Sequence, residues 1–262
     1  GYIVAGSTWS FGAGEGDFWV IKLNSFGEVE WQRTYGGEQT EYAHSIQPTS
    51  DGGYIVGGRT ETFGAGGYDC WILKLSHFGE VEWQRAYGGI GDWENCAAII
   101  EDHDGGYVVG GVTNSFGPGG RNLWVFKIDS YGNILWQHTY GGHAHEYSCS
   151  IREVREGGYI FAGFTNSYRL GAGRTDILVL KLSREGTIGE SCEIAGDSFA
   201  QVTETFVSPS DTNVRLTNTD VTPQNTDVLP REFGGSTNLL CESQGDSPRV
   251  RRSSRRVVPR RP

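Results

Sequence analysis

The sequence predicts an all-β fold, a β-propeller of four-stranded blades, from three observations. A segment of about 52 residues occurs four times, each copy holds short strand-like runs separated by turn signals, and the composition suits strands and turns. The 262 residues include 40 glycines, 12 tyrosines, 12 phenylalanines and 8 tryptophans, as is typical of short strands and tight turns. A repeat of this length built from strands predicts propeller blades, because one small sheet cannot bury both faces until neighbours stack on it.

The four copies are found by their glycine-led strands, GYIVAGST, GYIVGGRT, GYVVGGVT and GYIFAGFT. These strands start at Gly1, Gly53, Gly106 and Gly158, at intervals of 52, 53 and 52 residues. The copies therefore extend over about 1–35, 36–87, 88–140 and 141–190. The first copy lacks its opening strand, so the pattern predicts 15 of 16 strands. Because the chain begins inside a repeat, we interpret it as a piece of a longer protein.

The second copy shows how each repeat is predicted to fold. Its strand-like runs are residues 42–49, 53–60, 69–76 and 80–87. The turn SDGG joins the first two runs, and SHFG joins the last two. Glycine in such turns supplies the positive φ that a tight hairpin needs. A longer glycine-rich loop joins the middle strands, so each copy predicts one antiparallel sheet.

Tryptophans recur at two positions of the repeat. One set lies in the last strand, at Trp31, Trp83 and Trp136, and a second lies in the third strand, at Trp19, Trp71 and Trp124. Each ring buries about 150–250 Å², or roughly 4–6 kcal/mol of gross hydrophobic free energy. The last-strand tryptophans are therefore predicted to dock each blade on the next. The fourth copy has Leu178 and Glu190 at these positions, as is typical of a terminal repeat.

The lysines are the most regular charged residues. The chain has only four, all at one position of the third strand: Lys22, Lys74, Lys127 and Lys181. Acidic or amide residues recur five positions earlier, and glutamates recur in the first strands. We interpret the lysines as members of repeated Lys–carboxylate or Lys–carbonyl pairs that tie blade to blade. The alternative is a ring of cations that faces an anionic ligand in a central channel.

The second copy, DGGYIVGGRTETFGAGGYDCWILKLSHFGEVEWQRAYGG, resembles the repeats of bacterial and archaeal secreted or lipoprotein β-propellers, mostly of unknown function. Its KLxxxGxxxW core is similar to the tryptophan-docking motif of PQQ-like propellers. The resemblance covers residues 1 to about 190. It implies a propeller fold in a secreted or cell-surface protein. Members of the wider group include scaffolds, adhesins, binding modules and redox enzymes.

Histidines gather in the sequence HTYGGHAHEYSC, where His143, His145 and Cys149 are weak candidates for metal ligands. The equivalent segments of the other copies do not repeat this pattern. We therefore expect solvated loop histidines and no metal site. The segment EDHDGG at 101–106 resembles a calcium loop, but the matching turns lack its ligands, which favours an ordinary hairpin turn.

Five cysteines leave at least one unpaired within the chain. Cys70, Cys96 and Cys149 occupy non-equivalent positions of the repeats, which suggests incidental use in the core. Cys192 and Cys241 lie beyond the repeats, and a disulfide between them would suit an oxidising compartment.

The region after the repeats divides into two parts. Residues 191–242 contain a period-7 Thr/Val pattern interrupted by prolines and predict an extended, stalk-like Thr/Ser/Pro-containing segment, with a small strand-rich appendage as the alternative. Residues 243–262 predict a disordered basic tail. Seven of the 22 basic residues lie in 249–262, so the preceding 248 residues carry 15 basic and 32 acidic side chains. Such an acidic body disfavours binding to nucleic acid and anionic membranes, and no apolar run is long enough to span a bilayer.

The sequence therefore favours a non-enzymatic, extracellular scaffold or binding module that contacts protein or glycan through its blade loops. We expect no catalytic residues and no resident cofactor. The alternative is a redox or other enzyme with a cofactor in the central channel of a larger, quinoprotein-like propeller. Self-association through the open strand edge of the incomplete first blade is a further possibility.

Overall fold

The computed structural model describes residues 1–90, 93–167, 175–188, 195–197, 201–204 and 210–211. These residues form strands, turns and loops without any helix. The strands of the repeats are β1 (Tyr2–Thr8), β2 (Asp17–Leu23), β3 (Val29–Tyr35), β4 (Glu41–Pro48), β5 (Tyr54–Thr60), β6 (Asp69–Leu75), β7 (Val81–Gly88), β8 (Glu94–Glu101), β9 (Tyr107–Thr113), β10 (Asn122–Ile128), β11 (Ile134–Tyr140), β12 (Glu146–Glu153), β13 (Tyr159–Thr165) and β14 (Asp176–Leu182). Three short strands follow: β15 (Ala195–Asp197), β16 (Gln201–Glu204) and β17 (Ser210–Asp211).

The repeats fold into four antiparallel sheets, which we call units 1 to 4. Unit 1 contains β1 to β3, unit 2 contains β4 to β7, unit 3 contains β8 to β11, and unit 4 contains β12 to β14. The predicted strands of the second copy are confirmed to within one residue at each end. The predicted loss of the opening strand from the first copy is also confirmed. The expected last strand of the fourth copy falls largely on residues 189–194, outside the described residues.

Hairpin turns within each unit require glycine. Gly52 and Gly79 in unit 2 have φ values of 88° and 77°, in the left-handed region that disfavours other residues. The carboxylate of Asp51 supports the first turn, because its Oδ1 accepts a hydrogen bond of 3.0 Å from the backbone N–H of Gly53. The turn sequences therefore fix the register of the strands on either side.

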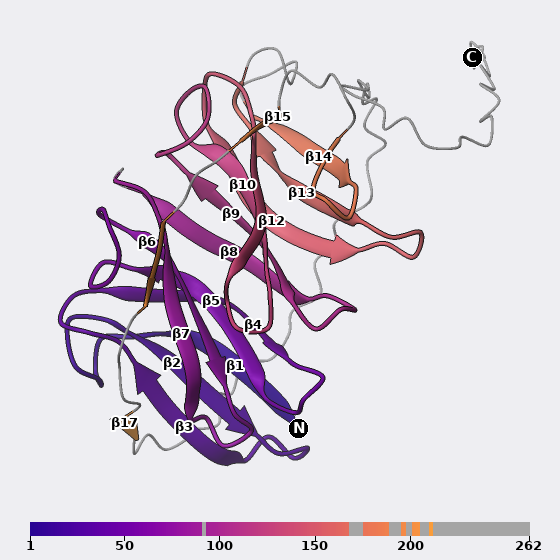
Figure 1. Cartoon of the computed structure of the whole chain (residues 1–262). Helices are drawn as coiled ribbons and strands as arrows, with labels where there is room; N and C mark the ends of the chain where they lie inside the picture. The colour runs from indigo at the N-terminus through magenta and orange to yellow at the C-terminus, as the bar shows by residue number, and fades with distance from the viewer. Residues whose placement is uncertain (91–92, 168–174, 189–194, 198–200, 205–209, 212–262) are drawn as a thin grey trace, which may run out of the picture.

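The units stack face to face in a row, from unit 1 near the N-terminus to unit 4 (Figure 1). Every substantial contact between the described strands of the repeats lies within one unit or between neighbouring units, so the described units form an open row. Three hydrophobic clusters fill the three junctions between units. At the first junction the rings of Phe18 and Trp71 lie 4.7 Å apart. Trp71 and Trp124 are fully buried at their junctions.

The last-strand tryptophans dock each unit on the next, as predicted. Trp83 of unit 2 donates a hydrogen bond of 2.9 Å from its indole Nε1 to the carbonyl oxygen of Ser130 in unit 3. Its ring lies 6.2 Å from that of Tyr107. The equivalent pairs are Trp31 with Tyr54 and Trp136 with Tyr159, at 6.0 and 6.2 Å.

The segment that follows the repeats returns along the row. Strand β15 pairs with β11 of unit 3, β16 with β7 of unit 2, and β17 with β3 of unit 1, all antiparallel. Each short strand therefore covers the outer edge of one sheet, where unpaired backbone groups would otherwise be open to other chains. For these three segments the strand-rich alternative is observed rather than a projecting stalk. The rest of 191–242 and the whole basic tail lie outside the described residues.

A disulfide joins units 2 and 3. Cys70 in β6 and Cys96 in β8 are fully buried and bonded, with their Cα atoms 5.1 Å apart, within the range usual for disulfides. The expectation that these two cysteines serve only as core residues was therefore wrong. The proposed pair Cys192 and Cys241 lies outside the described residues.

This disulfide predicts the result of peptide mapping. Non-reducing tryptic digestion of the folded protein should release two peptides joined through Cys70 and Cys96, and reduction should separate them. The same digest tests the pairing of Cys192 with Cys241. Alkylation of both Cys70 and Cys96 in the unreduced, denatured protein would contradict the assignment.

The lysines pair with carboxylates of their own unit. The Nζ of Lys74 lies 2.8 Å from Asp51 and 3.0 Å from Glu82, and that of Lys22 lies 2.6 Å from Glu30. The predicted Lys–carboxylate pairing is therefore confirmed for these residues. Its predicted role was wrong, because the carboxylate lies on the adjacent strand or turn of the same sheet and not on the next one. These cations are neutralised within the sheet and are poorly placed to face a ligand.

Candidate functional site

Repeated side chains build the scaffold of this protein, so a ligand site should occur where one unit departs from the others. Two such places exist among the described residues. One lies at the end of the sheets where a turn joins the first and second strands of each unit. We call this end the turn end. The other lies at the opposite end of the sheets, where a long loop joins the second and third strands of each unit. We call this end the loop end.

Buried carboxylates at the loop end are repeated and therefore belong to the scaffold. Glu94 is fully buried, and its Oε1 accepts hydrogen bonds of 2.8 Å from Thr113 Oγ1 and 3.2 Å from the backbone N–H of Ser115. Glu41 and Glu146 make the equivalent bonds with Thr60 and Thr165.

A second buried acid lies beside Glu94. Asp69 begins the third strand of unit 2, and its Oδ2 accepts hydrogen bonds from the backbone N–H groups of Ala65 and Gly66. Its Oδ1 is buried without a hydrogen-bond partner. Burial, with a further contribution from the charge of Glu94, raises the pKa of Asp69 to about 6. Gly88 must lack a side chain, because a Cβ there would come within 1.5 Å of Asp69 Oδ1.

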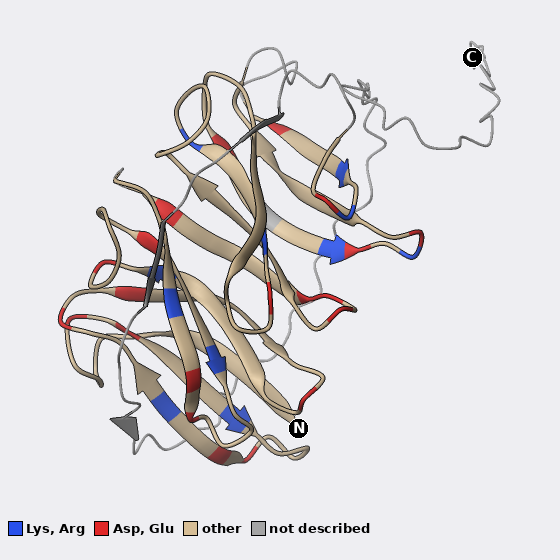
Figure 2. Ribbon diagram, viewed as in Figure 1, with Lys and Arg blue, Asp and Glu red and all other residues tan. Residues whose placement is uncertain are grey.

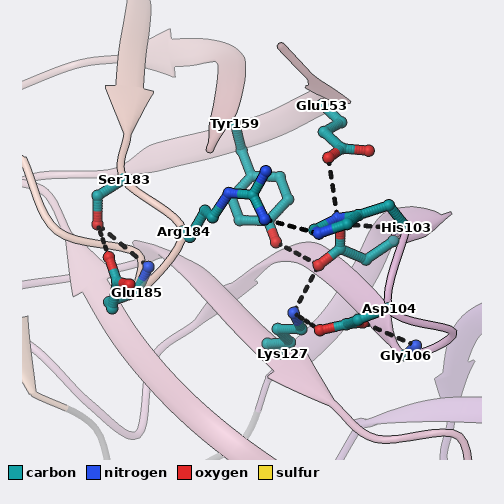
Figure 3. A network of polar contacts seen from close by, with 10 residues as sticks. His103, Asp104, Gly106, Lys127, Glu153, Tyr159, Ser183, Arg184 and Glu185 are labelled. Carbon is teal, nitrogen blue, oxygen red and sulfur yellow. Dashed lines mark hydrogen bonds and ion pairs between the residues drawn. The ribbon is translucent and has the colours of Figure 1, made fainter. Parts of the chain in front are cut away.

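The turn end holds a polar network between units 3 and 4 (Figure 3). Asp102 is its centre, with a side chain only 1% exposed. Its Oδ2 accepts hydrogen bonds from Lys127 Nζ at 2.5 Å and from the hydroxyl of Tyr159 at 2.7 Å. Its Oδ1 accepts from the backbone N–H of His103 at 2.8 Å. Lys127 also pairs with Asp104. Despite burial, these hydrogen bonds hold the pKa of Asp102 well below its usual range.

The same network contains three groups that can ligate metals. His103 Nδ1, a carboxylate oxygen of Asp102 and one of Glu153 lie within 4.8 Å of one another. However, Arg184 lies 2.6 Å from the other ring nitrogen of His103. Arginine can only donate, so this nitrogen accepts and Nδ1 carries the proton, which points to Asp102 at 2.7 Å and Glu153 at 3.1 Å. The three potential metal ligands are thus already hydrogen-bonded to other groups of the protein. The network is therefore better suited to joining units 3 and 4 than to holding a metal.

The loop end holds a cluster of aromatic and arginine side chains that is not repeated. The cluster consists of Trp9, Tyr42, Arg59, Tyr68, Trp93 and Arg121. These residues come from units 1, 2 and 3, on loops or at the adjacent strand ends. We call it the Trp–Arg cluster.

Arg59 lies among three rings of the Trp–Arg cluster. Its guanidinium carbon is 4.3 Å from the ring centroid of Tyr42, 4.7 Å from that of Tyr68 and 4.3 Å from that of Trp93. Arg121 lies 4.5 Å from Trp93. Each such cation–π contact contributes about 0.5–2 kcal/mol. The stacked rings therefore hold two positive charges at one place on an acidic protein.

Among the described residues no carboxylate forms an ion pair with Arg59 or Arg121. The Nε of Arg59 is buried without a hydrogen-bond partner. Burial lowers the pKa of Arg59, against the opposing effects of Tyr68 and of a hydrogen bond to Tyr42, and the charge of Arg121 makes a smaller contribution in the same direction as burial. An anion at this place would be favoured, because it would compensate both charges.

Trp9 supplies an open aromatic surface at the edge of the Trp–Arg cluster, on the side of Tyr42. Its side chain is 61% exposed, and its ring meets that of Tyr42 edge to face at 5.7 Å. A large exposed aromatic ring beside convergent polar groups is typical of a binding site. The Trp–Arg cluster can therefore hold a ligand that combines a negative charge with a flat, weakly polar face.

The structure describes two of the three candidate metal ligands that the sequence singled out, His143 and His145. His143 and His145 are exposed and contact backbone groups: His143 Nδ1 lies 3.2 Å from the carbonyl oxygen of Pro118, and His145 Nδ1 accepts from the backbone N–H of Arg121 at 3.1 Å. The side chain of Cys149 lies outside the described part of the structure. The sequence did not point to the Trp–Arg cluster. The available signal was the change of residue type at Arg59 and Trp93 relative to their repeat equivalents.

No protein-family model matches this sequence, and a search of curated proteins finds no similar one. Within the described residues, no helix is long and apolar enough to cross a membrane.

Proposed function

We propose that this chain is part of a β-propeller that acts as a non-enzymatic, extracellular binding module for glycans that carry carboxylate groups. The observation that carries the proposal is the Trp–Arg cluster. There Arg59 and Arg121 lie against Trp93 and form no ion pair within the described structure, and Arg59 also lies over Tyr42, whose ring meets the exposed ring of Trp9. An acidic sugar has one group that complements the arginines and another that complements the tryptophan. Its carboxylate can accept from the guanidinium groups, and the C–H face of its pyranose ring can pack on the indole.

The rest of the fold supports a binding role for the loop end. Repeated docking tryptophans and buried carboxylates make the sheets rigid. The long loops of units 1 to 3 share a glycine-rich core, SFGAG, TFGAG and SFGPG, and differ in the residues that flank it, which include Trp9, Tyr68 and Arg121. Function concentrates in loops that a rigid scaffold positions. The buried disulfide between Cys70 and Cys96 is compatible with an oxidising, extracellular location.

Binding to matched sugars tests this proposal. Isothermal titration calorimetry would compare sialyllactose with lactose, and oligogalacturonate with its methyl ester, so that each pair differs mainly in its carboxylate. We expect at least about tenfold tighter binding of one carboxylated sugar than of its neutral counterpart, equivalent to about 1.4 kcal/mol.

Variants of the cluster locate the site. Arg121→Gln should abolish the preference for the carboxylated sugar, and Trp9→Ala should weaken binding of both members of the pair. Arg155→Gln, in a turn at the opposite end of unit 4, is the matched control and should bind like the wild type. An Arg121→Gln variant that keeps the full preference, or a wild type that binds none of these sugars, would overturn the proposal.

A further inference from the structure

The turns between the third and fourth strands of units 1 to 3 carry an aromatic residue at one equivalent position: Phe26, Phe78 and Tyr131. These turns lie at the turn end, because successive connections of an antiparallel sheet alternate between its two ends (Figure 1). Turns of this kind favour glycine, asparagine, aspartate and serine. Turn formation therefore does not explain an aromatic residue in three successive units.

Packing does not explain these rings either. Phe78 is 69% exposed and Tyr131 is 71% exposed, although units 2 and 3 each have a described neighbour on both sides. Phe26 is 88% exposed. An aromatic ring stabilises a fold through the area that it buries, so rings exposed to this extent contribute little to stability. Aromatic residues that recur in exposed positions are instead typical of an interaction surface.

The preceding unit holds the turn around Phe78 in a fixed position. The carbonyl oxygen of His77, just before this ring, accepts a hydrogen bond of 3.2 Å from Trp31 Nε1 in unit 1. The carbonyl oxygen of Gly79, just after it, accepts one of 2.7 Å from the hydroxyl of Tyr35. The backbone on both sides of the exposed ring is thus anchored to unit 1.

The turn of unit 3 is held in the same way. The carbonyl oxygen of Ser130 accepts a hydrogen bond of 2.9 Å from Trp83 Nε1. That of Gly132 accepts one of 2.8 Å from the hydroxyl of Tyr87, and Tyr131 lies between these two carbonyl groups in the chain. In all three turns the backbone N–H of the aromatic residue also donates to the side chain two positions earlier: Asn24, Ser76 and Asp129. Preorganised turns therefore present the rings, which lowers the entropic cost of binding.

The charges near these turns favour an uncharged partner. Four basic side chains there are already paired with carboxylates: Lys22 with Glu30, Arg33 with Glu80, Lys74 with Asp51 and Glu82, and Lys127 with Asp102 and Asp104. Lys and Arg are spread over the sheets rather than gathered at one end (Figure 2). A phosphate-bearing surface would have to compete with carboxylates for these cations. Hydroxyl groups, in contrast, can donate to the carboxylates beside the rings.

We propose that the three rings, which we call the turn-tip row, bind extended, uncharged polysaccharides. Sheets stacked face to face lie on the order of 10 Å apart, so the rings follow one another along the row at intervals comparable to the disaccharide repeat of a β-1,4-linked chain. The flat C–H faces of the sugars can pack on the rings, while their hydroxyl groups bond to the polar side chains between them. The turn-tip row lies at the opposite end of the sheets from the Trp–Arg cluster and does not depend on that site.

Depletion by insoluble polysaccharides tests this proposal on the full chain. The protein is mixed with increasing amounts of microcrystalline cellulose or of chitin, and the fraction left in the supernatant is measured. We expect binding to at least one of the two polymers, with an affinity that changes by less than about twofold between low and high salt, because no ion pair contributes. Vesicles of phosphatidylcholine are the competing apolar surface and should not sediment the protein.

Turn variants locate the binding surface. Phe78→Ala and Tyr131→Ala should each weaken binding by about threefold or more. The double variant should weaken it by about tenfold or more, because both rings act on one polymer chain. Phe78→Tyr keeps the ring and should bind like the wild type. Ile90→Ala removes an equally exposed apolar side chain at the loop end and is the matched control, with binding unchanged.

A further variant separates this surface from the Trp–Arg cluster. Trp9→Ala should weaken binding of the acidic sugars and leave binding to the polymer unchanged. Unchanged thermal melting temperatures would show that the turn variants fold, as expected for exposed side chains. The proposal would be overturned by a wild type that binds neither polymer or sediments with the vesicles, by a double variant that binds as tightly as the wild type, or by loss of polymer binding in Trp9→Ala.

Discussion

Replacement of Asp102 by alanine should lower the free energy of unfolding by about 3–5 kcal/mol at pH 7, because it leaves the buried ammonium of Lys127 without its best-shielded partner. The hydroxyl of Tyr159 loses its acceptor in the same step. Both partners lie at the junction of units 3 and 4, so the loss should appear first as faster hydrogen exchange in unit 4. Urea denaturation followed by tryptophan fluorescence gives the free energy.

A neighbouring carboxylate supplies the control for this prediction. Asp104 also pairs with Lys127, but its side chain is 47% exposed. Solvent screens such a pair, and its removal by Asp104→Ala should cost at most about 1 kcal/mol. Equal losses in the two variants would show that burial of Asp102 does not set the strength of the network.

The pKa of Asp102 determines the pH range over which its carboxylate stabilises the folded protein. Because the folded protein holds this pKa far below the usual value of 3.8, the unfolded chain takes up protons first as the pH falls. The stabilisation is therefore complete above about pH 5 and is lost progressively in acid below about pH 4. The Asp102→Ala variant should lose less stability than the wild type on acidification in that range.

The architecture of the units could be predicted from the sequence because it depends on local and periodic signals. Gly52 and Gly79 mark hairpins through their need for positive φ, and the spacing of Trp31, Trp83 and Trp136 marks the docking strand. Each signal occurs several times at one interval. Repetition thus supplied the evidence that a single copy would have lacked.

Features that depend on contacts between stacked units could not be predicted from the repeat pattern. Cys70 and Cys96 occupy different strands of the repeat, and only the stacking of β6 against β8 brings them together. Arg59 aligns with Ser7, Val112 and Phe164, so its meeting with Trp93 and Arg121 is likewise a product of stacking. The return of β15 to β17 along the outer edges has no local signal either, because short segments of mixed composition pair with whatever edge is near.

Replacement of Asp69 by asparagine should have the opposite effect to the loss of Asp102 and stabilise the protein at pH 7. The folded protein retains a proton on Asp69 up to about pH 6, whereas the unfolded chain, with a pKa near 3.8, releases it earlier. Ionisation of Asp69 therefore opposes folding, and its contribution to stability falls as the pH rises from about 4 to about 6. Asparagine carries no charge, so this cost disappears and the free energy of unfolding at pH 7 should rise by about 1–3 kcal/mol.

The third junction already shows that this exchange fits the fold. There the equivalent of Asp69 is Asn122, fully buried beside Glu146, and its Nδ2 donates to the loop carbonyls of Phe116 and Gly120. Urea denaturation of Asp69→Asn at pH 4 and pH 7 should show equal stability to the wild type at the lower pH and a gain at the higher one. Asp51→Asn is the contrasting control: hydrogen bonds from Lys74 and Thr49 lower the pKa of Asp51 to about 2 against the opposing effect of burial, so its loss should destabilise the protein at pH 7. A destabilised Asp69→Asn at pH 7 would mean that the carboxylate is ionised in the folded protein and that its hydrogen bonds from Ala65 and Gly66 outweigh the cost of burying its charge.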